Sequence, residues 1–236
     1  MENITKNSYD KFAEMYARKN ATNLANAYYE RPAIISLLPE DLNNKNMVDA
    51  GCGSGILSEY LEKKGAKVIA FDYSKGLIDI AKKRLKTTNV RVANLEEKLD
   101  FIEDSSVDVI VSSLVLHYIE NWTPIFKEFK RILKPDGCIV FSIHHPHQDW
   151  YWFELENYFE KALRESSWNI DDSKFTIHVY HRTLMEVFNT ISEEDFYVER
   201  LLEPFPLEEG KKLDEEFYEK LITKPRFLFL RLKVKK

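Results

Sequence analysis

Three glycines stand within five residues, at Gly51, Gly53 and Gly55, although the whole chain of 236 residues contains only 7. Glycine lets the backbone turn sharply and lets a ligand approach it without interference from a Cβ atom. The cluster follows the short apolar run 46–50, and a helix-like run starts directly after it. This order predicts a strand, a tight turn and a helix, with a ligand bound at the carboxyl end of the strand.

Two kinds of nucleoside cofactor compete for such a turn. The dinucleotide fingerprint G-x-G-x-x-G requires a glycine at the position of Ile56, so it fits poorly. The observed spacing is G-x-G-x-G, with Asp49 two residues before the first glycine. Asp72 ends the next predicted strand, where a carboxylate can accept hydrogen bonds from two ribose hydroxyls. Because dinucleotide folds use the same device, Asp72 indicates a ribose without choosing between the cofactors.

Short apolar runs alternate with amphipathic runs as far as residue 145, which predicts a parallel sheet covered by helices. The N-terminal 40 residues read as two helices, the second interrupted by Pro32, and residues 134–137 read as a turn. After His144 the pattern changes to an aromatic and acidic stretch. The predicted strands cover 46–50, 67–71, 89–93, 107–111, 138–143, 175–181, 196–202 and 227–234, and the later predicted helices cover 56–64, 74–85, 123–133, 184–191 and 213–221.

These elements predict an α/β fold. A single domain is expected, because chains of this length commonly form one α/β domain. We expect a Rossmann-like, doubly wound, mostly parallel seven-stranded sheet with N-terminal helices and an inserted lid after strand five. The expected parts are an N-terminal helical cap (1–40), a cofactor-binding core (46–145), an inserted lid or acceptor region (146–182), and a C-terminal helix and strand pair that completes the sheet (183–236).

Several segments, in their order along the chain, resemble the motifs of class I S-adenosylmethionine-dependent methyltransferases. Within this class, the sequence most resembles the small-molecule methyltransferases of the ubiquinone/menaquinone and trans-aconitate type. The resemblance covers roughly residues 46–145 and implies S-adenosylmethionine as cofactor and S-adenosylhomocysteine as product. The matching segments are 48–55, 94–101, 106–119 and 126–137, together with 9–16 near the N-terminus.

The resemblance also implies a role for each matching residue. One departure is Asn94, because many family members carry Asp there; the carbonyl oxygen of Asn94 can still accept from the adenine amino group. The implied cofactor contacts are Tyr16 covering the site, Asp49, Gly51, Cys52, Gly53 and Gly55 at the methionine end, Asp72 at the ribose, Tyr73, Asn94 and Leu95 around the adenine, and Ser112 near the sulfonium.

Histidines follow two of the predicted strands, at His117 and at His144 and His145. Methyl transfer is an in-line displacement for which the protein supplies position and a water-poor cavity. A general base is needed only when the nucleophile arrives protonated, and these three histidines, with His147 and His181, are the candidates for it. Purely structural histidines are the alternative. No metal is expected, because Pro146 breaks helical spacing and no nearby cysteine completes a ligand set.

The stretch 150–159 contains six aromatic residues and would overhang the site as an insertion after strand five. We hypothesise that Trp150 and Trp152 contact the acceptor, with His181 as a further candidate. The alternative is an aromatic mini-core that only holds the insertion together.

The bulk properties narrow the possible partners. A net charge of −5 argues weakly against nucleic acid as a partner. The sequence has no apolar segment of about 18 residues, so no membrane-spanning helix is predicted. The N-terminus has no apolar signal segment, and the two cysteines fit no disulfide framework. The sequence therefore predicts a cytoplasmic monomer or homodimer that methylates a small-molecule acceptor. A non-catalytic S-adenosylmethionine binder, a protein or nucleic-acid methyltransferase and a NAD-dependent oxidoreductase stay open as alternatives.

Overall fold

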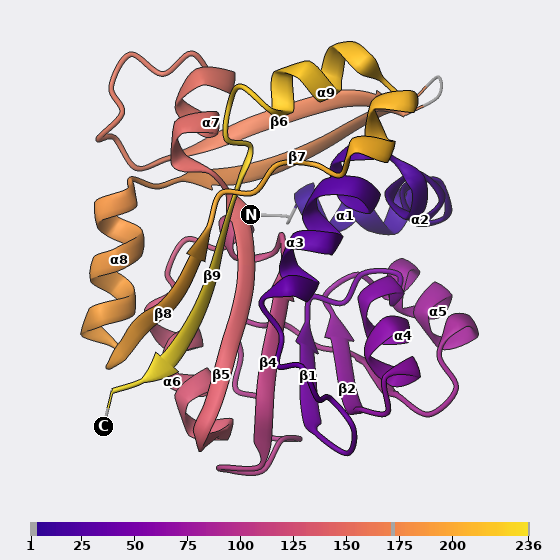
Figure 1. The fold of residues 1–236 in the computed structure, drawn as a ribbon, viewed down its shortest axis with the longest axis vertical. Coiled ribbons are helices and arrows are strands. Elements are labelled where there is room, and N and C mark those ends of the chain that lie inside the picture. Colours follow the sequence, from indigo (N-terminus) through magenta and orange to yellow (C-terminus); the bar gives the residue numbers. More distant parts are fainter. Residues whose placement is uncertain (1–3, 171–172, 236) are drawn as a thin grey trace.

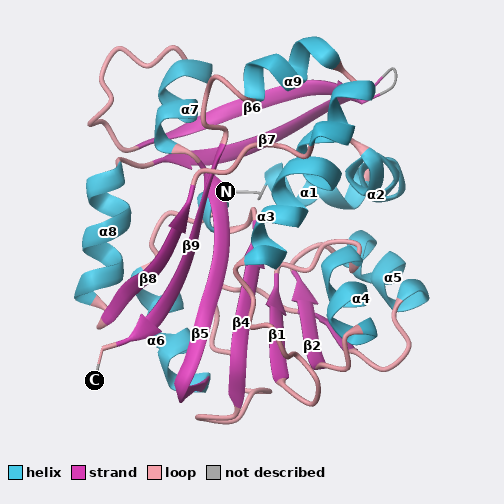
Figure 2. Cartoon of the chain, in the orientation of Figure 1, coloured by secondary structure: helices cyan, strands magenta, loops and turns pink. Residues whose placement is uncertain are grey.

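The structure, a computed structural model, describes residues 4–170 and 173–235 and has a twisted sheet with helices on both faces (Figures 1 and 2). Within these residues the main sheet has seven strands in the order β3-β2-β1-β4-β5-β9-β8. Strands β1 to β5 are parallel, and β9 is antiparallel to both its neighbours. The predicted mostly parallel, seven-stranded fold is confirmed. The strands are β1 (Asn46–Ala50), β2 (Lys67–Asp72), β3 (Asn89–Val92), β4 (Val107–Ser113), β5 (Leu133–His144), β8 (Phe196–Leu202) and β9 (Phe227–Val234).

Both faces of the sheet are buried, which explains why its strands read as nearly continuous apolar runs. In β5, for example, Ile139 and Phe141 belong to one apolar core and Cys138 and Val140 to the other. In the described chain no helix has the length and apolar character that crossing a bilayer requires. One core includes α6 (Thr123–Ile132) and α8 (Leu184–Glu193); the other includes α3 (Arg31–Ser36), α4 (Ile56–Lys63), α5 (Lys75–Arg84) and α9 (Glu215–Leu221).

Strand β5 begins earlier than the sequence suggested. The β4 residues Val107 and Val109 pair with Leu133 and Cys138 of β5, so the four β5 residues in between bulge out of the ladder. The turn predicted at 134–137 is therefore a bulge within a longer strand. Pairing on both sides of the bulge keeps the strand continuous, a long-range effect that local turn residues do not reveal.

The N-terminal cap consists of four short helical segments where two helices were expected. The first break falls at Phe12, and Asn23 starts a π-helical segment by accepting a hydrogen bond from the backbone N–H of Asn26 (2.8 Å). Pro32 lies in the first turn of α3, directly after η1, so the interruption expected there is a change from π-helical to α-helical backbone. The segments are α1 (Ile4–Lys11), α2 (Ala13–Thr22), the π-helix η1 (Leu24–Glu30) and α3.

The inserted region lies across the carboxyl ends of the strands, next to the cap (Figure 1). It forms a hairpin, separate from the main sheet, whose inner residues Phe175, Ile177 and Val179 are buried against aromatic side chains of α1 and α2. The sequence predicted the second strand of this hairpin but missed the first, which has no apolar alternation. Cap and insertion thus form one roof. The inserted elements are α7 (Pro146–Trp152), β6 (Ala162–Ile170) and β7 (Ser173–His181).

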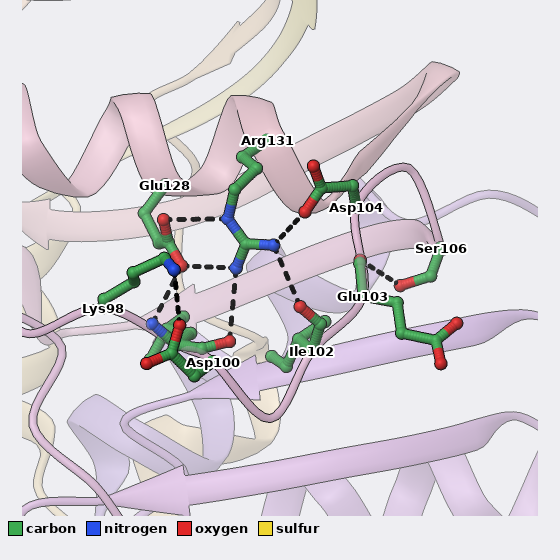
Figure 3. Close-up of polar contacts among 9 residues, drawn as sticks. Lys98, Asp100, Ile102, Glu103, Asp104, Ser106, Glu128 and Arg131 are labelled. Atoms are coloured by element: carbon green, nitrogen blue, oxygen red, sulfur yellow. Dashed lines mark hydrogen bonds and ion pairs between the residues drawn. The ribbon is translucent and has the colours of Figure 1, made fainter.

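Arg131 in the last turn of α6 fastens the long segment that leads from β3 to β4 (Figure 3). Its guanidinium donates to the carbonyl oxygens of Leu99 (3.2 Å) and Ile102 (3.0 Å). It also forms ion pairs with Glu128 of the same helix and with Asp104 of the segment. The first residues of this segment, 93–96, border the cavity described below, and α6 holds the part of the segment that follows them.

Replacing Arg131 by Met is expected to lower the free energy of unfolding at pH 7 by about 2 kcal/mol, because several charge-assisted hydrogen bonds are lost. Pairing with Arg131 lowers the pKa of Glu128. This stabilisation is therefore complete above the unfolded-state pKa of about 4.3 and is lost as the pH falls through the lower folded-state pKa. Urea unfolding at pH 7 and pH 3 should show the gap between wild type and variant narrowing in acid.

A matched control is Lys98→Met, which removes an exposed ion pair with Asp100 from the same segment and should change stability little. An Arg131→Met variant as stable as Lys98→Met would contradict the proposed fastening role.

Candidate active site

The glycine turn joins β1 to α4 where the strand order reverses, since β2 and β4 flank β1 on opposite sides. Open α/β sheets bind ligands in the crevice at such a point. Gly51, Gly53 and Gly55 have φ angles of 82°, 54° and 77°, a region that other residues rarely adopt. A Cβ at Gly51 would come within 2.3 Å of Val115, whereas a Cβ at Gly53 would meet no described atom within 4 Å. Gly53 borders a cavity, so this turn leaves room for a ligand beside its backbone.

Asp72 lies at the end of β2 beside this turn. Its Oδ2 accepts from the backbone N–H of Gly53 (2.9 Å), and its Oδ1 accepts from that of Ser74 (2.8 Å). Burial raises the pKa of Asp72, and these backbone hydrogen bonds act in the opposite direction. Each carboxylate oxygen has a further lone pair, so the group can still accept from two neighbouring hydroxyls. This donor and acceptor pattern fits a ribose.

The first cavity, of about 150 Å³, lies over the carboxyl ends of β1, β2 and β4. Its polar groups include Asp72 and Asn94. The segment after β4 supplies an apolar side through Leu114 and Val115, which were not among the predicted residues. Of the residues predicted to contact a cofactor, those that line this cavity are Tyr16, Gly51, Gly53, Asp72, Tyr73, Asn94 and Leu95.

A smaller cavity adjoins the first on the other side of the glycine turn, and the predicted residues Asp49 and Cys52 line it. Asp49 accepts a hydrogen bond from Ser58 Oγ (2.5 Å), and burial raises the pKa of Asp49 to about 7. Arg31 lines the same cavity, held by the carbonyl oxygen of Asn20 (3.0 Å). A carboxyl group and a guanidinium bordering one cavity fit the ammonium and carboxylate of an amino acid.

Two predicted cofactor residues lie behind the cavity walls. Gly55 packs closely against α5, where an added Cβ would come within 3.1 Å of the Ala81 side chain. Ser112 is fully buried and donates to the carbonyl oxygen of Ala50 (3.0 Å), which ties β4 to β1. The next residue, Ser113, is the one that borders the cavities.

A second, larger cavity of about 570 Å³ lies beneath the roof. Tyr16 and Leu114 line this cavity and both cavities beside the glycine turn, so all three meet at these side chains. Leu114 has a φ of 54°, which is unusual for a branched residue and is held by hydrogen bonds from its N–H to the carbonyl (3.1 Å) and Oγ (3.0 Å) of Ser142. Tyr9 and Tyr118 line the first and second cavities, and their hydroxyls are 2.7 Å apart.

His117 and His144 both line the second cavity, with their rings stacked 4.0 Å apart. His117 is buried, and neither of its ring nitrogens has a hydrogen-bond partner in the described part of the chain. Burial lowers the pKa of His117 well below its usual value, which keeps the ring neutral at pH 7. His144 Nδ1 lies 3.3 Å from Asp149 Oδ1, so a carboxylate orients this ring. Asp149 was not among the predicted residues.

Of the other residues predicted on the acceptor side, only Trp152 lines the second cavity. The ring of Trp150 contacts His147 instead. His145 Nδ1 accepts from the N–H of His147 (3.0 Å) and so caps α7. His181 is fully buried, with its Nε2 at 2.8 Å from the carbonyl oxygen of Tyr158. No group of three or more His, Cys, Asp or Glu side chains in residues 4–170 and 173–235 could hold a metal ion.

Known proteins match both the sequence and the structure. A family model described as a methyltransferase domain matches residues 48–141. An uncharacterized protein of Haemophilus influenzae is 31% identical over 245 residues, covering 94% of each chain. The crystal structure of a proposed S-adenosylmethionine-dependent methyltransferase from Listeria monocytogenes has a TM-score of 0.77 at 26% identity, covering 88% of this chain and 97% of that one.

The chain belongs to the class I S-adenosylmethionine-dependent methyltransferases. It is a methyltransferase with S-adenosylmethionine as its cofactor, as the resemblance of residues 46–145 implied. The ubiquinone biosynthesis O-methyltransferase of Actinobacillus pleuropneumoniae is 29% identical over 154 residues, which cover 60% of this methyltransferase and 66% of that enzyme.

Replacing Gly53 by Ala is expected to weaken binding of S-adenosylhomocysteine about tenfold, since the new methyl group would occupy space bordering the first cavity. Gly65→Ala is the matched control: Gly65 also has a positive φ (82°) but lies outside the cavities described here. Isothermal titration calorimetry measures the affinities, and urea unfolding measures the backbone strain common to both variants. Equal affinities in the two variants would contradict the position assigned to the ligand.

Proposed function

We propose that the acceptor is a small molecule that binds in the second cavity, while S-adenosylmethionine occupies the two cavities beside the glycine turn. The three cavities meet at Tyr16 and Leu114, and this junction is the main support for the proposal. In-line displacement requires donor and acceptor to be held close together and in line, and this junction is where the cavities bring them together. A volume of about 570 Å³ lies in the usual range for small-molecule sites.

The cofactor contacts follow from the walls of the two cavities. Asp72 accepts hydrogen bonds from the ribose hydroxyls, and Tyr73 and Asn94 border the adenine. At the methionine end, Arg31 binds the carboxylate and Asp49 accepts from the ammonium group. When bound, S-adenosylmethionine supplies an electrophilic methyl group on a sulfonium.

The roof favours a small acceptor over a polypeptide or nucleic acid. Tyr16 stacks on Phe175 of the inserted hairpin, with ring centroids 5.8 Å apart and an interplanar angle of 11°. Tyr9 packs edge-on to both rings, at 4.8 and 5.1 Å. These contacts close the space above the strands, and they support a single domain in which cap and insertion cover one site. By its name, the Actinobacillus relative acts in ubiquinone biosynthesis, which also favours a small acceptor.

For an acceptor that arrives protonated, His144 takes the proton. Its ring borders the second cavity, and Asp149 orients it through Nδ1, so Nε2 is the nitrogen that can face the acceptor. The neutral His117 packs flat against it and limits the orientations of the ring. Trp152 supplies part of the aromatic wall.

A transfer assay on fractionated extracts tests the class of acceptor. The purified enzyme is incubated with methyl-labelled S-adenosylmethionine and with either the low-molecular-weight fraction or the protein and nucleic-acid fractions of a bacterial extract. We expect labelled product only in the low-molecular-weight fraction, and none with Asp72→Ala, which loses the ribose acceptor. Label in a polypeptide or nucleic acid would overturn the proposal.

With the acceptor from that assay, His144→Asn should lower kcat about 100-fold when the acceptor is an alcohol or phenol, because the proton acceptor is lost. The affinity for S-adenosylhomocysteine should not change, since His144 does not line the cofactor cavities. His147→Asn, in the same segment but outside the second cavity, is the control. An unchanged kcat for His144→Asn would remove His144 from the mechanism.

A further inference from the structure

Arg226 borders the second cavity immediately before β9. Its guanidinium carbon lies 5.7, 5.3 and 5.4 Å from the ring centroids of Trp152, Phe217 and Phe227. These rings come from α7, α9 and β9, and each of them also lines the cavity. A planar cation among aromatic rings at one side of a cavity forms a site for a flat ligand.

The buried Nε of Arg226 has no hydrogen-bond partner among the residues that the structure describes. In the described ranges, four arginines have a buried Nε without a well-formed hydrogen bond: Arg91, Arg164, Arg226 and Arg231. The other three each have an acceptor near the guanidinium, namely Asn89 (3.2 Å), Glu160 (3.6 Å) and Glu199 (2.6 Å). Arg226 has no such hydrogen bond or ion pair with a described side chain, and of the four it alone borders one of the three cavities described above.

The carboxylates of the cavity wall already have partners. Asp149 faces His144, and Asp214 Oδ1 accepts from the N–H of Phe217 (2.9 Å) to cap α9. Burial lowers the pKa of Arg226, and the neighbouring Tyr29 and Asp149 offset this only in part. A partly buried guanidinium without an anion in contact is unfavourable, and an anionic ligand in the cavity would relieve that cost.

We propose that the acceptor carries an anionic group, a carboxylate or a phosphate, which the guanidinium of Arg226 binds. This inference rests on the proposed function, because it assumes that the acceptor occupies the second cavity. Arginine binds both anions through two parallel N–H donors, which fixes the direction of the ligand as well as its charge. The rings of Trp152, Phe217 and Phe227 pack against the apolar part of the same ligand. The anion thus anchors one end of the acceptor, and the nucleophile lies toward Leu114, where the cavities meet.

Three ring-bearing probes of similar size test the inference: benzoate, phenyl phosphate and the neutral benzamide. Each is titrated calorimetrically into the full-length enzyme saturated with S-adenosylhomocysteine, so that only the acceptor side is free. Wild type should bind at least one of the anions at least tenfold more tightly than benzamide. Binding of only one anion would identify the carboxylate or the phosphate as the group bound.

The variant Arg226→Gln removes the charge and should weaken binding of the preferred anion at least tenfold, while benzamide binding changes less than twofold. Arg226→Lys keeps the charge but lacks the planar guanidinium. Its affinity for the preferred anion should lie between the affinities of wild type and Arg226→Gln. Arg91→Gln is the matched control, because Arg91 also stacks on a ring, that of Phe101 (4.3 Å), but borders none of the cavities.

Unchanged S-adenosylhomocysteine affinity in Arg226→Gln verifies that this variant is folded. If Arg226→Gln does not fold, the anion affinity of Arg226→Lys is compared with that of wild type instead. Wild type that binds S-adenosylhomocysteine but binds the anions no better than benzamide, or not at all, would overturn the role of Arg226 and leave the proposed function intact. The role of Arg226 would also be overturned if Arg91→Gln weakened anion binding as much as Arg226→Gln does. Labelled macromolecules in the transfer assay would instead overturn the proposed function itself.

Discussion

A buried carboxylate connects the N-terminal cap to the edge of the sheet where the cavities meet. Glu30 Oε1, at the end of η1, accepts from Ser113 Oγ and Ser142 Oγ, both at 2.7 Å. These hydroxyls lie near the carboxyl ends of β4 and β5, so one oxygen atom holds three elements together. Burial raises the pKa of Glu30, and the two hydrogen bonds and the charge of Arg31 act against that rise. Because η1 leads directly into α3, this contact sets where the cap lies over the strands.

The other side of the cap is held by rings. Tyr9 and Tyr16 pack on Phe175 of the inserted hairpin, and the hydroxyl of Tyr9 is bonded to that of Tyr118 in the short η2 helix (Leu116–Tyr118). The cap is thus attached to the sheet by hydrogen bonds below and to the insertion by aromatic packing above. The cavities are the space that these two attachments leave between them. A shift of α2 would alter all three cavities, since Tyr16 borders each of them.

The predicted residues that line the first cavity depend mainly on local backbone geometry for their positions. The glycine turn and Asp72 lie in consecutive strand–turn–helix units, where strand ends and helix starts fix their positions. Arg31 and Arg226 escaped prediction because each reaches the site only through tertiary contacts: Arg31 by the packing of the cap, Arg226 by the antiparallel pairing of β9 with β5. The first strand of the hairpin was missed for a similar reason, since its partner β7, and not its own side-chain pattern, makes it a strand.

This difference between local and long-range construction bears on how acceptors are selected. The cofactor side is built largely from the backbone and strand ends of residues 48–141, the region matched by the family model. The second cavity, which is the proposed acceptor site, takes Asp149, Trp152, Phe217 and Arg226 from outside that region. Side chains on an insertion and on the last helix and strand can change without disturbing the strand order or the glycine turn. Under the proposed function the acceptor is therefore selected by segments outside the region that the family model matches, and Arg226 is the one cation that we propose for its recognition.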